Sequence, residues 1–277
     1  MQYKFALIGY PITHSLSPWI HEHFLQATNL EGSYTIYEIS PEKDFANEME
    51  KLKKEAFHGF NVTVPYKEKM IPYLDEIDSQ AKKIGAVNTV LQKDGRWIGY
   101  NTDGIGYVRA LFHKFQELRE TKNIKILLLG AGGAAKGILH ALLYEGFQHI
   151  TIANRSLERA EILAKAKEGI EVISLDEAAR RLDHFSLIIQ TTSVGMKPKE
   201  EDVIISLENI KENTIVSDIV YQPIETRFLQ EAKERGARIH YGHSMLLYQA
   251  QYAFEIWTEK EPDAQSLDEK LKQTLEG

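Results

Sequence analysis

The sequence contains no cysteine and no long apolar run, and each absence excludes a class of protein. Without cysteine there can be no disulfide bond, no thiolate metal site and no cysteine nucleophile. No apolar run approaches the roughly 20 residues that a membrane-spanning helix needs. Residues 1–12 also lack the basic start and apolar core of a signal peptide. We therefore expect a cytoplasmic protein that does not associate with membranes.

Positive charge is scarce as well. The chain has 33 Lys and Arg against 40 Asp and Glu, a formal net charge of -7, and no basic cluster. Because nucleic-acid binding depends on concentrated Lys and Arg, we expect no nucleic-acid partner. The histidines show no spacing typical of metal ligands, so we expect no bound metal.

The first half of the chain alternates short apolar runs with amphipathic segments, which favours parallel strands joined by helices. The pattern predicts strands at 3–8, 34–39 and 59–64, and helices at 18–27 and 42–54. Asp94-Gly95 then separates strands predicted at 87–92 and 96–100. Asp-Gly is a strong hairpin signal, so this first sheet is expected to be mixed.

A second alternation begins with the apolar run 124–129. Further strands are predicted at 149–153, 171–173, 187–190, 215–219 and 238–240. The last helices, at about 244–260 and 266–275, follow this unit, and we expect them to pack on the first domain. At 277 residues the chain is long enough for two domains.

The apolar run 124–129 ends in a glycine loop. Residues 130–135 read Gly-Ala-Gly-Gly-Ala-Ala, which fits G-x-G-x-x-A where a strand enters a helix. Glycines allow backbone N–H groups to approach a pyrophosphate, and the helix N-terminus adds partial positive charge. The loop therefore predicts a dinucleotide site; the alternative is a tight turn that serves packing alone.

The end of the next strand indicates which dinucleotide. An NAD-specific site places Asp or Glu there, on the ribose hydroxyl, whereas this chain has Asn154-Arg155-Ser156. Arg155, with Arg159 one helical turn later, could hold a 2′-phosphate through bidentate hydrogen bonds. The pattern favours NADP over NAD, the alternative being that the arginines are a solvated helix start.

Polar residues in the first half have two interpretations each. Ser17 precedes Pro18 and could cap a helix, or Ser15 and Ser17 could donate hydrogen bonds to a ligand carboxylate at a helix N-terminus. The segment 61–67 follows the carboxyl end of a strand, where α/β sheets bind ligands. Asn88 and Asp103 could bind hydroxyl groups or simply form turns.

Together these motifs resemble one enzyme family. His-Ser-Leu-Ser-Pro at 14–18, Asn-Val-Thr-Val-Pro-Tyr-Lys at 61–67, Gly-Ala-Val-Asn-Thr at 85–89 and Asn-Thr-Asp-Gly at 101–104 occur in the order seen in shikimate dehydrogenases. The glycine loop and the tail at 242–249 follow in the same order. The resemblance covers residues 8–257, and this combination of motifs is far more specific than the glycine loop alone.

The resemblance implies the reversible NADPH-dependent reduction of 3-dehydroshikimate to shikimate, an oxidoreductase step in aromatic amino-acid biosynthesis. The substrate-binding residues it implies are Ser15, Ser17, Thr63, Lys67, Asn88, Asp103, Tyr221 and Gln249, with Lys67 and Asp103 as the catalytic pair. The cofactor-binding residues it implies are Gly130, Ala131, Gly132, Gly133, Ala134, Asn154, Arg155, Ser156, Arg159, Ile219 and Gly242.

The fold expected is α/β in two domains with a deep cleft between them. Residues 1–103 with 237–277 would form a mixed-sheet substrate-binding domain, and 104–236 a Rossmann-type NADP-binding domain. The sequence leaves open whether the protein is a monomer or a homodimer.

Ketone reduction places negative charge on the carbonyl oxygen, so a nearby cation lowers the barrier. A lysine is ordinarily protonated at neutral pH. Our hypothesis is that the Lys67 ammonium stabilises the oxyanion and donates the proton, while Asp103 orients it. Two alternatives remain: a quinate/shikimate dehydrogenase of broader specificity, and a non-catalytic sensor that binds NADP or a shikimate-like ligand. Retention of both Lys67 and Asp103 speaks against the sensor.

Overall fold

The computed structural model describes residues 2–276. The chain divides into two compact units, each with its own sheet: one contains the residues up to Gly106 together with Leu247–Leu267, and the other contains Tyr107–Leu246 together with the residues from Asp268 onward. Two helices, α4 (Asp103–Lys114) and α9 (His243–Thr258), have residues in both units.

The first unit contains a six-stranded mixed sheet. Its order is β2-β1-β3-β5-β6-β4, in which β1 is parallel to β2 and β3, and β5 is antiparallel to β3 and β6. The strands are β1 (Tyr3–Gly9), β2 (Gly32–Glu38), β3 (Gly59–Val62), β4 (Glu76–Ile77), β5 (Thr89–Lys93) and β6 (Arg96–Tyr100). The predicted hairpin turn is present: Asp94 and Gly95 both have positive φ, as a two-residue primed turn requires.

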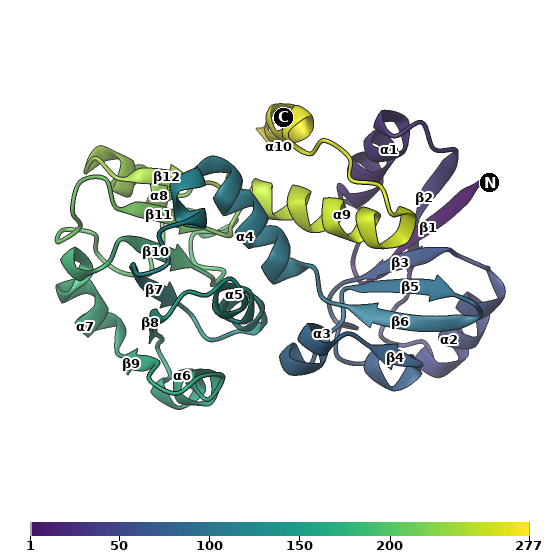
Figure 1. Ribbon diagram of the computed structural model, residues 1–277, viewed down its shortest axis with the longest axis horizontal. Coiled ribbons are helices and arrows are strands. Elements are labelled where there is room, and N and C mark those ends of the chain that lie inside the picture. The colour runs from purple at the N-terminus through teal and green to yellow at the C-terminus, as the bar shows by residue number, and fades with distance from the viewer. Residues whose placement is uncertain (1, 277) are drawn as a thin grey trace. The chain divides into compact units, whose positions relative to one another are not determined.

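Helices cover both faces of this sheet (Figure 1). The helices of the unit are α1 (Ser17–Ala27), α2 (Phe45–Lys54) and α3 (Ser79–Ile84), with a 3-10 turn at Ile71–Tyr73. On one face, Met49 and Leu52 of α2 pack with Ile8 and Phe60. On the other, Trp257 of α9 stacks on Phe5, 4.6 Å between ring centroids.

Helix α2 begins three residues later than the sequence predicted. Asp44 is its N-cap, and the Asp44 side chain accepts a hydrogen bond from the Ala46 backbone N–H. Residues 42–43 therefore precede the helix, because an aspartate cap satisfies a free N–H of the first turn. Strand β3 likewise ends at Val62 rather than at 64, so Thr63 lies just past its carboxyl end.

The second unit contains a parallel sheet of order β12-β11-β10-β7-β8-β9. Its strands are β7 (Lys125–Leu129), β8 (His149–Ala153), β9 (Glu171–Ile173), β10 (Leu187–Gln190), β11 (Ile215–Asp218) and β12 (Arg238–His240). Numbered along the unit, this is the 3-2-1-4-5-6 order of the Rossmann fold. The remaining elements are α5 (Gly133–Tyr144), α6 (Leu157–Ala164), α7 (Leu175–Arg180), α8 (Arg227–Glu234) and α10 (Gln265–Glu276), with 3-10 turns at Gln116–Arg119 and Leu182–His184.

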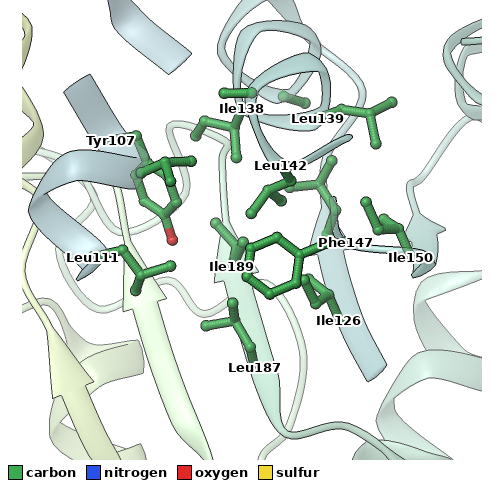
Figure 2. Close-up of a cluster of buried hydrophobic side chains, with 14 of the residues drawn as sticks. Tyr107, Leu111, Ile126, Ile138, Leu139, Leu142, Phe147, Ile150, Leu187 and Ile189 are labelled. Carbon is green, nitrogen blue, oxygen red and sulfur yellow. The ribbon is translucent and has the colours of Figure 1, made fainter. Parts of the chain in front are cut away.

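Both faces of the parallel sheet are buried, which explains why its strands are continuous apolar runs. Along β7, Ile126 and Leu128 pack on the face covered by α4, α5 and α6, whereas Leu127 and Leu129 pack on the face covered by α7 and α8. Figure 2 shows the first of these cores, with the Phe147 ring among the aliphatic side chains of the sheet and of α5.

The expected fold class, α/β with one mixed sheet and one Rossmann-type sheet, is confirmed. The assignment of 237–277 to the first domain differs from the structure. Strand β12 pairs with β11, and α10 from Asp268 onward belongs to the second unit. There, Asp268 Oδ1 lies 3.3 Å from His243 Nε2, and the Lys272 ammonium lies over the Tyr241 ring. These side-chain contacts, which sequence periodicity does not reveal, lie between α10 and the rest of the second unit.

No helix among residues 2–276 is long and apolar enough to cross a membrane.

Candidate active site

The carboxyl end of the first sheet brings together polar side chains that are far apart in the sequence. The Lys67 Nζ donates to Asp103 Oδ2 at 2.5 Å. Lys67 follows β3, and Asp103 begins α4 after β6, so the sheet places the two beside each other across 36 positions of sequence. The side chains are 29% and 22% exposed, which leaves this ion pair partly accessible to a ligand.

Asn88 supports the ion pair through hydrogen bonds to Asp103 and to the neighbouring Thr102. Its Nδ2 donates to Asp103 Oδ1 at 2.8 Å and to Thr102 Oγ1 at 2.9 Å, while its Oδ1 accepts from the Thr102 backbone N–H at 2.8 Å. With both ends of the amide bonded, Asn88 is fixed in orientation. Asp103 therefore has one oxygen held by an amide and the other by an ammonium.

Gln249 of α9 also reaches this cluster. Its Oε1 lies 3.5 Å from Asn88 Nδ2 and 3.4 Å from Thr102 Oγ1. Helix α9 can approach because α4 has glycine at the crossing. A Cβ on Gly106 would lie 2.4 Å from the Gln249 backbone nitrogen.

Ser15 and Ser17 lie at the start of α1 and bond to each other. The Ser15 Oγ donates to the Ser17 Oγ at 3.2 Å and accepts from the Ser17 backbone N–H at 3.2 Å. Ser17 is not the N-cap: the cap is Leu16, which makes no side-chain cap bond. The capping interpretation of Ser17 is thus wrong, because the helix starts at Ser17 itself and its hydroxyl is directed to other partners.

The other two predicted substrate residues lie apart from these bonds. Thr63 follows β3, and a Cβ added to Gly9 would lie 2.4 Å from the Thr63 methyl carbon. Tyr221 belongs to the second unit and is exposed, in the loop after β11.

In the second unit, the glycine loop follows β7 as predicted. Gly130 has φ of +114°, and a Cβ on it would lie 2.6 Å from Thr191 Oγ1, so a side chain would be excluded. Gly132 is the N-cap of α5 with no side-chain cap bond, and a Cβ on Gly132 or Gly133 would meet open space. The first N–H groups of α5 thus face a surface that an anion can approach, with Ala131 and Ala134 as small neighbours.

The end of β8 presents the predicted basic residues. Asn154 Nδ2 donates to the Ser156 carbonyl at 2.8 Å, and Ser156 caps α6 by accepting from the Arg159 N–H. Arg155 and Arg159 are exposed and form no ion pair with any other described residue. Their charge is therefore available to an external anion.

The last two predicted cofactor residues, Gly242 and Ile219, are in contact: a Cβ on Gly242 would lie 2.5 Å from the Ile219 carbonyl.

The sequence analysis missed several buried polar residues. Asn61, Thr89 and Thr102 are almost fully buried and hydrogen-bonded around Asn88. A polar residue within an otherwise buried strand, as at Asn61, is the signal that could have identified them, because burying an unbonded polar group is costly.

A second missed group lies at the ends of β10 and β11. Asp218 is fully buried at the end of β11 and accepts from the Val220 N–H, the Thr226 hydroxyl and the Gln190 amide. Burial raises the pKa of Asp218 to about 7. These bonds tie the loop after β10 to the loop after β11.

No group of three or more His, Cys, Asp or Glu that could hold a metal occurs within residues 2–276.

Three family descriptions match consecutive parts of the chain. They are shikimate dehydrogenase substrate binding domain at residues 7–90, shikimate / quinate 5-dehydrogenase at 113–227, and shikimate 5'-dehydrogenase C-terminal domain at 242–272. A curated relative, shikimate dehydrogenase (NADP(+)) of Oceanobacillus iheyensis, is 54% identical over 277 residues and is covered in full, as is this chain.

Solved structures are similar over nearly the whole chain. A shikimate 5-dehydrogenase from Thermus thermophilus, in complex with NADP(H) and shikimate, has a TM-score of 0.86 and 34% identity, covering 99% of each chain. A quinate dehydrogenase from Corynebacterium glutamicum, in complex with NAD, has a TM-score of 0.87 and 27% identity, covering 99% of this chain and 98% of that one.

Proposed function

Because the chain belongs to the shikimate dehydrogenase family, we propose that it catalyses the reversible NADP-dependent interconversion of 3-dehydroshikimate and shikimate. The observation that carries this proposal is the accessible Lys67–Asp103 ion pair at the carboxyl end of the mixed sheet. The protein is therefore an oxidoreductase acting on a CH–OH group, in the synthesis of aromatic amino acids.

Lys67 is the catalytic cation in this proposal. As the substrate ketone is reduced, charge accumulates on its oxygen, and the Lys67 ammonium stabilises that oxygen and donates a proton to it. Asp103, bonded to Lys67 at 2.5 Å and to Asn88 at 2.8 Å, holds the ammonium in one place and is available to the substrate hydroxyl. An orientation held in advance avoids reorganisation during the reaction.

The remaining substrate contacts follow from position and chemistry. Ser15 and Ser17, with the N-terminus of α1 behind them, bind the substrate carboxylate. Thr63, Asn88, Tyr221 and Gln249 bind the ring hydroxyls.

The cofactor supplies the hydride when bound. The uncapped N-terminus of α5 fits its pyrophosphate, and the exposed Arg155 and Arg159 fit a 2′-phosphate, which is what separates NADP from NAD. Gly130 to Ala134, Asn154, Ser156, Ile219 and Gly242 complete the cofactor side. The first unit, with its ion pair, is the substrate domain, and the second is the NADP domain. We place the enzyme in the cytoplasm, as a monomer or homodimer.

The test is the formation of NADPH, followed by absorbance, when purified protein is mixed with shikimate and NADP⁺. Shikimate and quinate are each assayed with NADP⁺ and with NAD⁺. We expect shikimate with NADP⁺ to give the highest kcat/KM. A preference for quinate or NAD⁺ would favour the broader quinate/shikimate activity, and binding without turnover would favour a sensor.

A further inference from the structure

The first unit contains a buried row of polar side chains that the proposed mechanism does not use. Tyr34 on β2 is 4% exposed, Asn61 on β3 is 5% exposed, and Thr89 at the start of β5 is 0% exposed. Polar groups this deeply buried are costly unless each one is hydrogen-bonded. Their bonds therefore have defined partners and directions.

The Tyr34 hydroxyl sets the orientation of Asn61. It lies 2.8 Å from Asn61 Oδ1, and burial raises the pKa of Tyr34, so the phenol stays protonated and donates its single hydrogen. Asn61 must then present its oxygen to Tyr34 and its nitrogen to the other side. That nitrogen donates to Thr89 Oγ1 at 3.0 Å and to the Asn88 carbonyl at 3.2 Å.

Thr89 extends these hydrogen bonds to the proposed ion pair. On the far side, Thr89 Oγ1 donates to Asn88 Oδ1 at 3.0 Å. Each group can therefore donate to the next in one direction, and the chain of donors ends on a carboxylate: Tyr34, Asn61, Thr89, Asn88 and Asp103.

We propose that Tyr34 is a positioning residue of the substrate site, whose hydroxyl fixes the Asn61 amide and, through Thr89, the Asn88 amide that holds Asp103. This inference rests on the proposed function, since it assigns Asn88 and Asp103 to substrate binding. Tyr34 touches no reacting atom. It acts through Asn61 and Thr89 on the Asn88 amide that supports the Lys67–Asp103 ion pair.

The physical consequence of losing this hydroxyl is specific. In Tyr34→Phe the ring still stacks on His21, 4.4 Å between centroids, because the substitution removes only the oxygen. Asn61 Oδ1 loses its donor, so the Asn61 amide and the Thr89 and Asn88 side chains bonded beyond it gain alternative orientations. Substrate must then reorder them on binding, which weakens its apparent affinity.

The test compares Tyr34→Phe with Tyr37→Phe. Tyr37 lies on the same strand, but its hydroxyl bonds to Glu48 at 3.3 Å, outside the chain of donors. We expect Tyr34→Phe to raise the KM for shikimate about tenfold, with the KM for NADP⁺ and the kcat little changed. Tyr37→Phe should change none of the three. A folded Tyr34→Phe with the wild-type KM for shikimate overturns the proposal.

Two further variants separate positioning from general loosening of the fold. In a double-mutant cycle, Thr89→Val and Tyr34→Phe should be non-additive in the KM for shikimate, because Tyr34 acts through Asn61 on Thr89; additivity contradicts this. Thr89→Val breaks the same chain beyond Asn61 and does not depend on Tyr34→Phe folding. It should also raise the KM for shikimate, and an unchanged value contradicts the proposal.

A measurement that does not require turnover distinguishes failure of the proposed function from failure of the positioning role of Tyr34. If the wild type does not oxidise shikimate, the proposed function fails and the KM values cannot be measured. NMR of protein labelled at asparagine then decides the positioning role. Nuclear Overhauser contacts between the Asn61 Nδ2 hydrogens and the Thr89 methyl group are expected in the wild type and should weaken in Tyr34→Phe. Equal contacts in both proteins contradict a role for Tyr34.

Discussion

At the scale of single residues, the proposed chemistry depends on one ammonium group. Lys67 is held by Asp103, which Asn88 holds in turn, so the cation has a single orientation. Because the charge it stabilises exists mainly in the transition state, its removal should affect turnover more than binding.

Lys67→Ala should lower kcat for shikimate oxidation by at least about 100-fold while leaving the Kd for NADP⁺ within about twofold. Steady-state kinetics and cofactor fluorescence titration measure the two quantities. Lys69→Ala is the matched control, since Lys69 is exposed and lies over the Tyr66 ring rather than at the ion pair. Turnover near the wild-type value in Lys67→Ala would exclude the proposed role.

Arg155→Ala should raise the KM for NADPH about tenfold or more and that for NADH much less, because only NADPH carries the 2′-phosphate that a guanidinium binds bidentately. The measurement is initial rate with each cofactor. Arg180→Ala, also exposed in the second unit, should change neither value. Equal increases for both cofactors would rule out a phosphate contact.

At the scale of elements, two close approaches decide which side chains meet. Helices α4 and α9 cross at Gly106, and the loops after β10 and β11 are joined by Asp218. In each case a small or buried residue permits a contact between elements that are distant in the chain.

Gly106→Ala should destabilise the protein by about 1–3 kcal/mol, because the added Cβ would lie 2.4 Å from the Gln249 backbone and the helices would have to separate. Separation would also move the Gln249 side chain, so the KM for shikimate should rise. Urea denaturation and kinetics test both effects. An unchanged unfolding midpoint would contradict this prediction, because it would mean that the two helices accommodate a Cβ at position 106 without separating.

Asp218→Ala should destabilise the second unit by about 3 kcal/mol or more, because three donors would lose their buried acceptor. Asp218→Asn keeps an acceptor oxygen and should cost less than the alanine variant. Urea denaturation followed by circular dichroism compares the two. Equal loss in both variants would mean that the hydrogen bonds are not what stabilises these loops.

At the scale of the whole molecule, each unit contains a buried histidine whose pKa is strongly lowered. Burial lowers the pKa of His21 in the first unit and of His240 in the second to about 3. Between pH 6.5 and 3 the unfolded chain therefore binds protons that the folded chain does not, and stability falls as the pH falls.

In the second unit, Asp218 opposes the effect of His240 on stability at low pH. Its pKa is raised to about 7, so between about pH 4 and 7 the folded state holds a proton that the unfolded state has lost. Its contribution therefore increases as the pH falls, opposite in sign to that of His240.

We therefore expect acidification from pH 7 to 5 to destabilise the first unit, by about 1–2 kcal/mol, more than the second. Hydrogen–deuterium exchange, corrected for the intrinsic exchange rate, reports on each unit separately. His21→Phe should abolish the acid response of the first unit. Equal acid responses of the two units in the wild type would contradict this account.

The sequence by itself determined the local features. Strand and helix positions followed from periodicity, the hairpin from Asp94-Gly95, and the loop between β7 and α5 from its glycines. These patterns can be read because backbone geometry and the burial of a strand face act over a few residues.

Only the tertiary structure decided which distant polar groups meet. Tyr34 and Asn61 are 27 positions apart and Lys67 and Asp103 are 36 apart, and strand order alone makes each pair neighbours. The attachment of α10 to the second unit through Asp268 was decided in the same way. Hydrogen bonds and ion pairs of this kind leave no periodic trace, because each partner is specified by the fold around it rather than by its neighbours in sequence.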